Sequence, residues 1–151
     1  MKKKDVMILS ELRNNSRISL TNLSKRTLIP ISTIFDKLRS YEDNFISKHT
    51  TLLNFTKMGY SARASIMISI DSHQKEEAKD FLRICPNINS VYKVTNGYDF
   101  MVEGIFIDIR EMEEFFEKLE SRFSIKDKKV FYIIDDIKRE SFMTDPDMTF
   151  V

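Results

Sequence analysis

Residues 17–41, RISLTNLSKRTLIPISTIFDKLRSY, contain two short amphipathic helical patterns that are separated by a tight turn. Ser19 is a favourable N-cap for the first helix, and Leu23 has the spacing of a buried residue. Thr27-Leu28-Ile29 is the predicted turn, and Pro30 starts the second helix, since proline is favoured at a helix start. This arrangement is typical of a helix-turn-helix that binds DNA.

The second of these helices has one apolar side and one polar side. Ile34, Leu38 and Tyr41 are spaced i, i+4 and i+7, which predicts that they face the protein core. The opposite side is rich in hydroxyl and charged groups, and Phe35 lies at its flank. We expect this side to contact base edges in a major groove, whereas the alternative for any single residue is a solvated helix surface. The candidate base-contacting residues are Ser32, Thr33, Asp36, Arg39 and Ser40.

The charge of the chain is unevenly distributed, although the net charge of its 151 residues is only +1. Residues 1–50 contain ten Lys or Arg and five Asp or Glu, a formal charge of +5, so residues 51–151 carry −4. A basic N-terminal part suits contacts with DNA phosphates. The candidates for these contacts are Arg13, Arg17, Lys25, Arg26, Lys37 and Lys48.

The segments on either side of the helix-turn-helix complete a first module. Before it, Asp5 is the predicted N-cap of a helix that ends near Asn14-Asn15. After it, residues 45–53 alternate weakly between apolar and polar side chains, which predicts a short strand or wing. Residues 54–60, which include Gly59, are the predicted hinge to the rest of the chain.

A change of hydrophobic period marks a second module. Residues 62–70 alternate between apolar and polar side chains, which predicts a half-buried strand. Asn96-Gly97 is a strong hairpin signal, and Asp108 with Glu111 matches a capping box at the start of a helix. The predicted elements are strands at 62–70, 88–95, 100–107 and 130–134, with helices at 75–83 and after Asp108.

The order βαββαβ predicts a ferredoxin-like fold, in which two helices cover one face of an antiparallel four-stranded sheet. Because the other face of such a sheet is left open, we expect two copies of the chain to pack there as a dimer. The tail at residues 138–151 has weak periodicity, and we expect it to add an edge strand or an arm.

Several short motifs occur in an order and spacing that match one known family. They are Asp5, Ile8-Leu9 and Arg17-Ile18-Ser19; then Leu23, Lys25-Arg26, Ile29, Ser32-Thr33-Ile34, Leu38 and Glu42; and finally Thr95-Asn96-Gly97-Tyr98-Asp99. Through these motifs nearly the whole chain resembles the Lrp/AsnC (leucine-responsive regulator/AsnC) family of prokaryotic transcription factors. The resemblance implies an α+β protein with a winged helix-turn-helix at 1–50, a connector at 51–60, a ferredoxin-like RAM-type domain at 61–137 and a tail at 138–151.

The resemblance also implies a regulator that binds double-stranded DNA as a homodimer or a higher homo-oligomer, with an amino acid as its effector. It places Tyr98 and Asp99 nearest the effector, where Asp99 would hold an ammonium group; the alternative is that Asp99 caps the hairpin. Two positions depart from the family. Its glycine before the second helix of the helix-turn-helix is Leu28 here, and the glycine of its second-module turn lies one place later, at Gly97.

An enzyme is the rival class, because the siroheme decarboxylases resemble this family in architecture. They would carry histidines near the hairpin of the second module, whereas the two histidines of this chain, His49 and His73, both lie outside that hairpin. No Ser-His-Asp order and no glycine-rich phosphate loop is present, so we expect no catalytic residues. A further alternative is an interaction module that has lost DNA binding.

The amino-acid composition excludes several other kinds of site and protein. The single cysteine, Cys85, excludes a disulfide within the chain and a thiolate zinc cluster, and we expect no metal and no cofactor. No run of residues approaches the roughly 18 apolar residues of a membrane span. We therefore expect a cytoplasmic protein that does not bind membranes.

Overall fold

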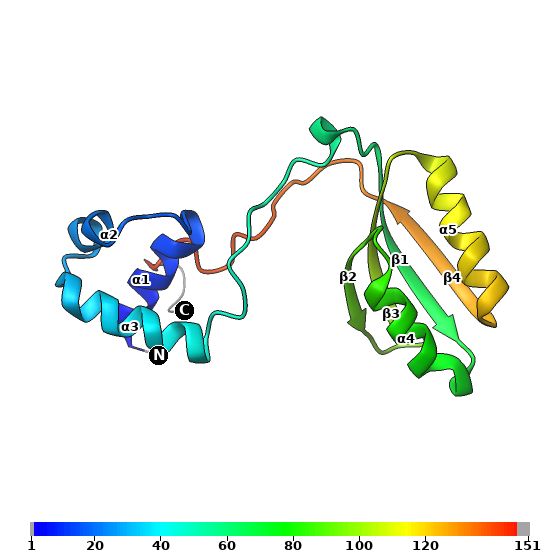
Figure 1. The fold of residues 1–151 in the computed structure, drawn as a ribbon, viewed down its shortest axis with the longest axis horizontal. Coiled ribbons are helices and arrows are strands. Elements are labelled where there is room, and N and C mark those ends of the chain that lie inside the picture. The colour runs from blue at the N-terminus through cyan, green and yellow to red at the C-terminus, as the bar shows by residue number, and fades with distance from the viewer. Residues whose placement is uncertain (1, 148–151) are drawn as a thin grey trace. The chain divides into compact units, whose positions relative to one another are not determined.

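The computed structural model describes residues 2–147, which form two compact units (Figure 1). The first unit comprises residues 2–52 together with residues 137–147, and the second comprises residues 53–136. The predicted tail therefore belongs to the first unit as far as residue 147, and residues 148–151 lie outside the described residues.

Three helices form the first unit: α1 at Lys3–Asn14, α2 at Leu20–Thr27 and α3 at Ile31–Asn44. All three confirm the helices predicted from hydrophobic spacing. Ser19 caps α2 as predicted, because its Oγ accepts a hydrogen bond from the backbone N–H of Asn22 at 3.2 Å. The side chains that meet in the core are those of Ile8, Leu23, Ile29, Ile34 and Tyr41, all at most 3% exposed.

The N-cap predicted for α1 is wrong. Lys2 occupies the N-cap position, and Asp5 lies three residues later, inside the first turn. One carboxylate oxygen of Asp5, Oδ2, accepts a hydrogen bond from the backbone N–H of Lys2 at 3.0 Å. Asp5 therefore still stabilises the start of α1, because it satisfies a backbone donor that the helix leaves without a partner.

The turn between α2 and α3 requires a left-handed backbone at Leu28, with φ +57° and ψ 30°. Residues other than glycine and asparagine adopt this left-handed backbone conformation at an energetic cost, because their Cβ atom approaches the following carbonyl oxygen. The side chain of Leu28 is 89% exposed, so packing does not offset this cost.

No strand forms at residues 45–53, so the strand predicted there is wrong. α3 ends at Asn44, and residues 46–54 are neither helix nor strand. Weak alternation alone does not produce a strand, because a strand also needs a neighbouring strand for its backbone hydrogen bonds. A short 3-10 helix, η1 at Thr56–Met58, follows this segment, and Gly59 after it adopts φ +95°.

The second unit is the predicted βαββαβ fold. The sheet order is β2-β3-β1-β4, and each neighbouring pair is antiparallel. A 3-10 helix, η2 at Ser72–Gln74, leads into α4. The elements are β1 at Ala62–Ile70, α4 at Lys75–Ile84, β2 at Ile88–Lys93, β3 at Phe100–Phe106, α5 at Ile109–Arg122 and β4 at Ile125–Tyr132.

Both helices of the second unit cover the same face of its sheet. Every second residue of β1, from Ala62 to Ile70, is buried, as the alternating pattern predicts. These residues pack with Leu82 of α4 and with Phe116 of α5 in a single hydrophobic core. Asp108 caps α5, because its Oδ1 accepts a hydrogen bond from the backbone N–H of Glu111 at 2.9 Å. The capping prediction is therefore confirmed.

The last strand, β4, begins five residues before the predicted start at Val130. Its first five residues, IKDKK, are mostly charged, so no hydrophobic pattern in the sequence indicates a strand there. Because β4 lies at an edge of the sheet, long charged side chains reach solvent there. Lys126 illustrates this, since its side chain is 56% exposed. Lys128 instead packs over the Phe116 ring, with its Nζ 3.9 Å from the ring centroid and 2.6 Å from Oε1 of Glu120.

The tail forms no edge strand at residues 137–147, so that alternative is wrong. It contacts the end of α1 instead. Arg13 donates hydrogen bonds to the carbonyl oxygens of Glu140 and Phe142, at 2.9 and 3.1 Å, and Asn14 donates to the carbonyl oxygen of Thr144 at 2.7 Å. The described part of the tail is therefore an arm of the first unit, the other predicted alternative.

Replacing Leu28 with glycine should raise the free energy of unfolding of the first unit by about 1 kcal/mol, because glycine adopts a left-handed conformation without the steric cost. Thermal unfolding followed by the circular dichroism of the helices measures this change. Leu28→Ala is the matched control, since alanine retains Cβ and the lost side chain is exposed. Equal stability of the glycine and alanine variants would contradict strain at this turn.

Candidate functional site

The polar side of α3 is open to solvent. Ser32, Asp36, Arg39 and Ser40 are exposed and Thr33 is half-buried, whereas Ile34 and Tyr41 on the opposite side are at most 3% exposed. The five residues expected to contact base edges therefore share one accessible face of one helix. Hydroxyl, carboxylate and guanidinium groups on such a face can bind the donors and acceptors of base edges.

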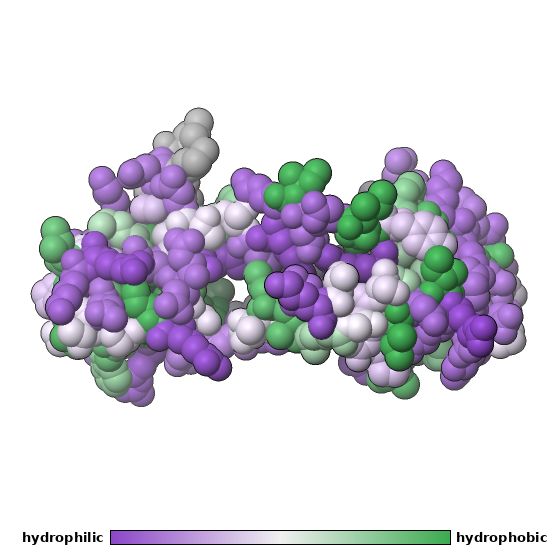
Figure 2. Space-filling view, turned by 90° about the horizontal axis from the view of Figure 1, so that it is seen from above, coloured by the Kyte–Doolittle hydropathy of each residue, from purple (hydrophilic) through white to green (hydrophobic). Residues whose placement is uncertain are grey.

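Apolar side chains also lie on the exposed surface of α3. Ile31 is 45% exposed and Phe35 is 51% exposed, and both precede Arg39 along the helix. Helical spacing predicted Phe35 only at the flank of the polar face, and no role was predicted for Ile31. Helical spacing gives the side of a residue but not how far its side chain extends from the core, so this exposure emerges only from the structure. Exposed apolar side chains interrupt the hydrophilic surface of the protein (Figure 2).

The predicted phosphate-contacting residues have different surroundings. Arg17, Lys25 and Lys48 are exposed, and Arg17 lines a shallow hollow with Ser16 and residues 49–51. Arg26 is 63% exposed and forms an ion pair with Glu11 at 2.9 Å. Surface ion pairs contribute little stability, so the guanidinium of Arg26 can exchange this partner for a phosphate.

Lys37 differs from the other predicted phosphate contacts because its ion pair, with Asp5 of α1, is largely buried: the two side chains are only 27% and 13% exposed. The hydroxyl of Tyr41 donates a hydrogen bond to the same carboxylate oxygen, at 2.7 Å. The hydrogen bonds from Lys37 and Tyr41 lower the pKa of Asp5 from 3.8 to about 2, and burial together with Asp5 raises the pKa of Tyr41. This cluster joins the first turn of α1 to the middle of α3, and it directs the Lys37 ammonium toward the protein.

The predicted effector residues lie beside the β2–β3 turn. Asn96 and Gly97 both adopt positive φ, 69° and 91°, as the hairpin signal predicts. The hydroxyl of Tyr98 donates a hydrogen bond to Oδ2 of Asp127 at 2.5 Å. The structure does not bring Tyr98 and Asp99 together around a common partner, because Asp99 has partners of its own.

Asp99 is held by two groups of its own chain. Its Oδ2 accepts a hydrogen bond from the backbone N–H of Ile70 at 2.9 Å, and its Oδ1 lies 2.6 Å from Nζ of Lys75. Burial opposes ionisation of Asp99, but these two partners lower its pKa below the ordinary value. The carboxylate thus binds an ammonium group, and that group belongs to Lys75.

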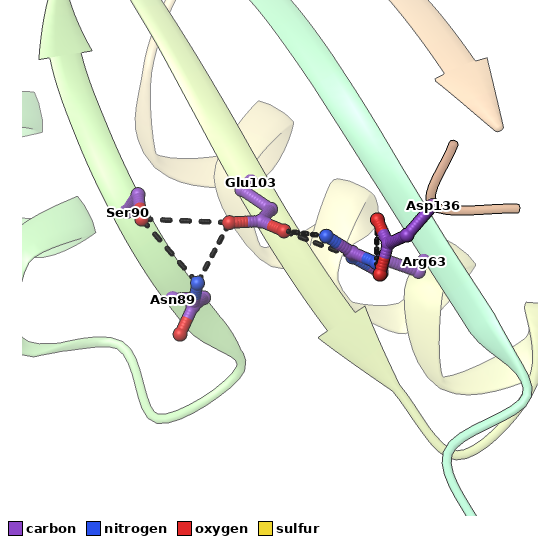
Figure 3. Close-up of polar contacts among 5 residues, drawn as sticks. All are labelled: Arg63, Asn89, Ser90, Glu103 and Asp136. Carbon is purple, nitrogen blue, oxygen red and sulfur yellow. Dashed lines mark hydrogen bonds and ion pairs between the residues drawn. The ribbon is translucent and has the colours of Figure 1, made fainter. Parts of the chain in front are cut away.

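Sequence reasoning did not find an ionic network on the sheet face opposite the helices (Figure 3). Arg63 of β1 lies between two carboxylates, with nitrogen–oxygen distances of 2.7 Å to both Glu103 and Asp136. Glu103 of β3 also accepts a hydrogen bond from Asn89 Nδ2 at 2.7 Å. The side chains of Arg63 and Glu103 are only 17% and 20% exposed. The available sequence signal was a single charged residue within each of two otherwise uncharged strands.

The described residues 2–147 contain no group of three or more His, Cys, Asp or Glu side chains that could hold a metal ion. The helices of that same range include none with the length and apolarity required to cross a membrane.

Two family models match the two parts of the chain. A model described as winged helix-turn-helix DNA-binding matches residues 1–44, which contain α1, α2 and α3. A second, described as the Lrp/AsnC ligand binding domain, matches residues 63–142, which include all but the first residue of the four-stranded sheet.

The chain is also similar to individual proteins over almost its full length. It is 28% identical to an uncharacterised HTH-type transcriptional regulator of Pyrococcus furiosus, covering 94% of this chain and 96% of the relative. It is 22% identical to the glutamate uptake regulatory protein of Zymomonas mobilis, covering 95% and 90%. A crystal structure of a transcriptional regulator from Neisseria meningitidis in complex with L-Met has a TM-score of 0.84, with 24% identity and coverage of 92% and 93%.

Replacing Asp5 with asparagine should lower the free energy of unfolding by about 2 kcal/mol at pH 7. The ionised carboxylate stabilises the folded state fully above pH 3.8, and this contribution is lost as the pH falls through about 2. The difference between wild type and Asp5→Asn should therefore shrink between pH 4 and pH 2. Denaturant unfolding at several pH values measures it, with Asp43→Asn, an exposed carboxylate of α3, as the control. A constant difference over this range would refute the role given to the ionised form.

Proposed function

Because the chain belongs to the Lrp/AsnC family of transcriptional regulators, we propose that it binds operator DNA as a dimer or a higher oligomer and that an amino acid modulates this binding. The observation that carries the proposal is the exposed face of α3, on which hydroxyl, carboxylate and guanidinium groups lie together. The role is non-catalytic and cytoplasmic. Two copies of α3 in a dimer would contact two half-sites, so the operator is pseudo-palindromic.

Base edges and phosphates are contacted by different residues. Arg39 is suited to a guanine, because its guanidinium can donate two hydrogen bonds to O6 and N7. Asp36 can accept a hydrogen bond from a cytosine amino group, and the hydroxyls of Ser32, Thr33 and Ser40 suit several bases. Phosphates are contacted by Arg17, Lys25, Arg26 and Lys48. Lys37 supports this face through its ion pair with Asp5, and that pair must open if Lys37 is to reach a phosphate.

Each segment has a role in this proposal. Residues 1–50 bind DNA, residues 51–60 connect the units, and residues 61–137 provide oligomerisation and effector binding. Oligomerisation uses the sheet face opposite the helices, where Tyr92 and Phe131 are more than half exposed. The exposed area of these aromatic rings supports contact with a second copy of the chain.

The effector part of the proposal concerns Tyr98 and Asp99, beside the β2–β3 turn. The Neisseria meningitidis relative was solved in complex with L-Met, which favours an amino acid as the effector here. In this chain, Lys75 already pairs with Asp99. An effector ammonium at Asp99 would therefore have to displace Lys75, and Tyr98 would have to leave Asp127 if its hydroxyl also bound the effector.

DNA binding and its salt dependence test the proposal. The protein should bind duplexes selected from a random pool, and its affinity should fall steeply as salt rises. Arg39→Ala should relax the preference at one base position and weaken binding to the selected site by about 1–3 kcal/mol. Lys25→Ala should weaken binding to all sequences alike and reduce the salt slope by about 1. Absence of salt-dependent binding at about 100 mM salt would refute DNA binding.

An amino-acid effector should raise the melting temperature of the protein, on the order of 5 °C at a hundred times its Kd. A thermal-shift screen with the twenty amino acids measures this effect. Asp99→Asn should abolish the shift, because it removes the negative charge that binds the ammonium group, whereas Glu114→Gln on the exposed side of α5 should retain it. If no amino acid raises the melting temperature of the wild type, the proposal of an amino-acid effector is refuted. If Asp99→Asn shows the same shift as the wild type, only the role of Asp99 in binding the effector is refuted.

A further inference from the structure

The exposed surface of α3 contains two parallel rows of side chains. Residues four apart lie on the same side of a helix, one turn above the other. Ile31, Phe35 and Arg39 therefore form one row, apolar at its start and cationic at its end. The neighbouring row is polar and consists of Ser32, Asp36 and Ser40.

The fold of the first unit does not require the apolar row. Its core is completed by the other side of α3, where Ile34 and Tyr41 are at most 3% exposed and Leu38 packs against them. Ile31 and Phe35 are 45% and 51% exposed, and Leu28 just before the helix is 89% exposed. Ile31 and Phe35 lie one turn apart on the same side of α3, and adjacent exposed apolar side chains mark interaction sites.

The surroundings of this row favour DNA as its partner. The row ends in Arg39 and adjoins two hydroxyl groups, and residues 1–50 carry a formal charge of +5. The major groove presents one apolar group, the C5-methyl of thymine, among its hydrogen-bonding groups. A row that combines isoleucine and phenylalanine with arginine thus complements thymine methyls beside a guanine.

We propose that Ile31 and Phe35 contact thymine C5-methyl groups in the major groove, next to the base contacted by Arg39. The inference rests on the proposed DNA-binding function and adds two specificity-determining residues to it. Residues four apart are separated by about 6 Å along a helix, on the order of two base-pair steps. Each operator half-site therefore contains thymines within a few base pairs of the guanine that Arg39 contacts.

Operators in which single thymines are replaced by deoxyuridine test this inference, because the replacement removes only the methyl group. With the wild type, replacement at one or two positions per half-site should weaken binding about fourfold, the effect of exposing one methyl group. With Phe35→Ala, the thymine and deoxyuridine operators should bind equally well at one of these positions. Phe142→Ala is the matched control, because this phenylalanine of the same unit is 77% exposed and lies outside α3.

The outcomes separate this inference from the proposed function. Methyl contacts are refuted if sequence-specific binding is insensitive to every deoxyuridine, or if both Ile31→Ala and Phe35→Ala keep the wild-type sensitivity at every position. Either result leaves the proposed DNA-binding function standing. If the wild type binds no DNA at all, the proposed function itself is refuted. A change in oligomeric state of Phe35→Ala, measured by light scattering without DNA, assigns the row to a second copy of the chain and also overturns the inference.

Discussion

α3 can bury only one of its sides, and the rest of the first unit depends on which side that is. Ile34 and Tyr41 pack against α1 and α2, and the Tyr41 hydroxyl reaches the carboxylate of Asp5. Lys37 adds an ion pair to the same carboxylate. Packing and this polar cluster together determine the rotation of α3, because a turned helix would bury Arg39 and leave Asp5 without its partners. The candidate DNA-contacting face is thus a consequence of how the core is filled.

Much of the fold could be predicted from the sequence, because local residue patterns determine many of its helices, strands and turns. Period-two alternation predicted β1, the capping residues Ser19 and Asp108 predicted the starts of α2 and α5, and Asn96-Gly97 predicted the hairpin. Features that depend on distant partners could not be predicted in this way. The strand pairing of the charged start of β4, the absence of a strand at 45–53 and the return of the tail to α1 are all of this kind.

In the candidate site too, local patterns predicted some features, whereas contacts between residues distant in the sequence were not predicted. The exposed side of α3 follows from spacing alone, and Ser32, Asp36, Arg39 and Ser40 lie where the sequence placed them. Ion pairs across the fold are invisible to such reasoning, because Asp5 is far from Lys37 in the sequence, as Arg63 is from Glu103. These pairs change what individual residues can do. Lys37 and Asp99 each have a partner within the chain, whereas spacing and family resemblance alone left both available for external ligands.

A structure of the protein bound to a selected operator duplex tests the central claim most directly, namely that the exposed face of α3 contacts DNA. We expect α3 to lie in the major groove, with Arg39 within hydrogen-bonding distance of a base edge and with Ile34 and Tyr41 still buried. A complex in which DNA contacts the sheet unit, or in which α3 faces away from the groove, would contradict it.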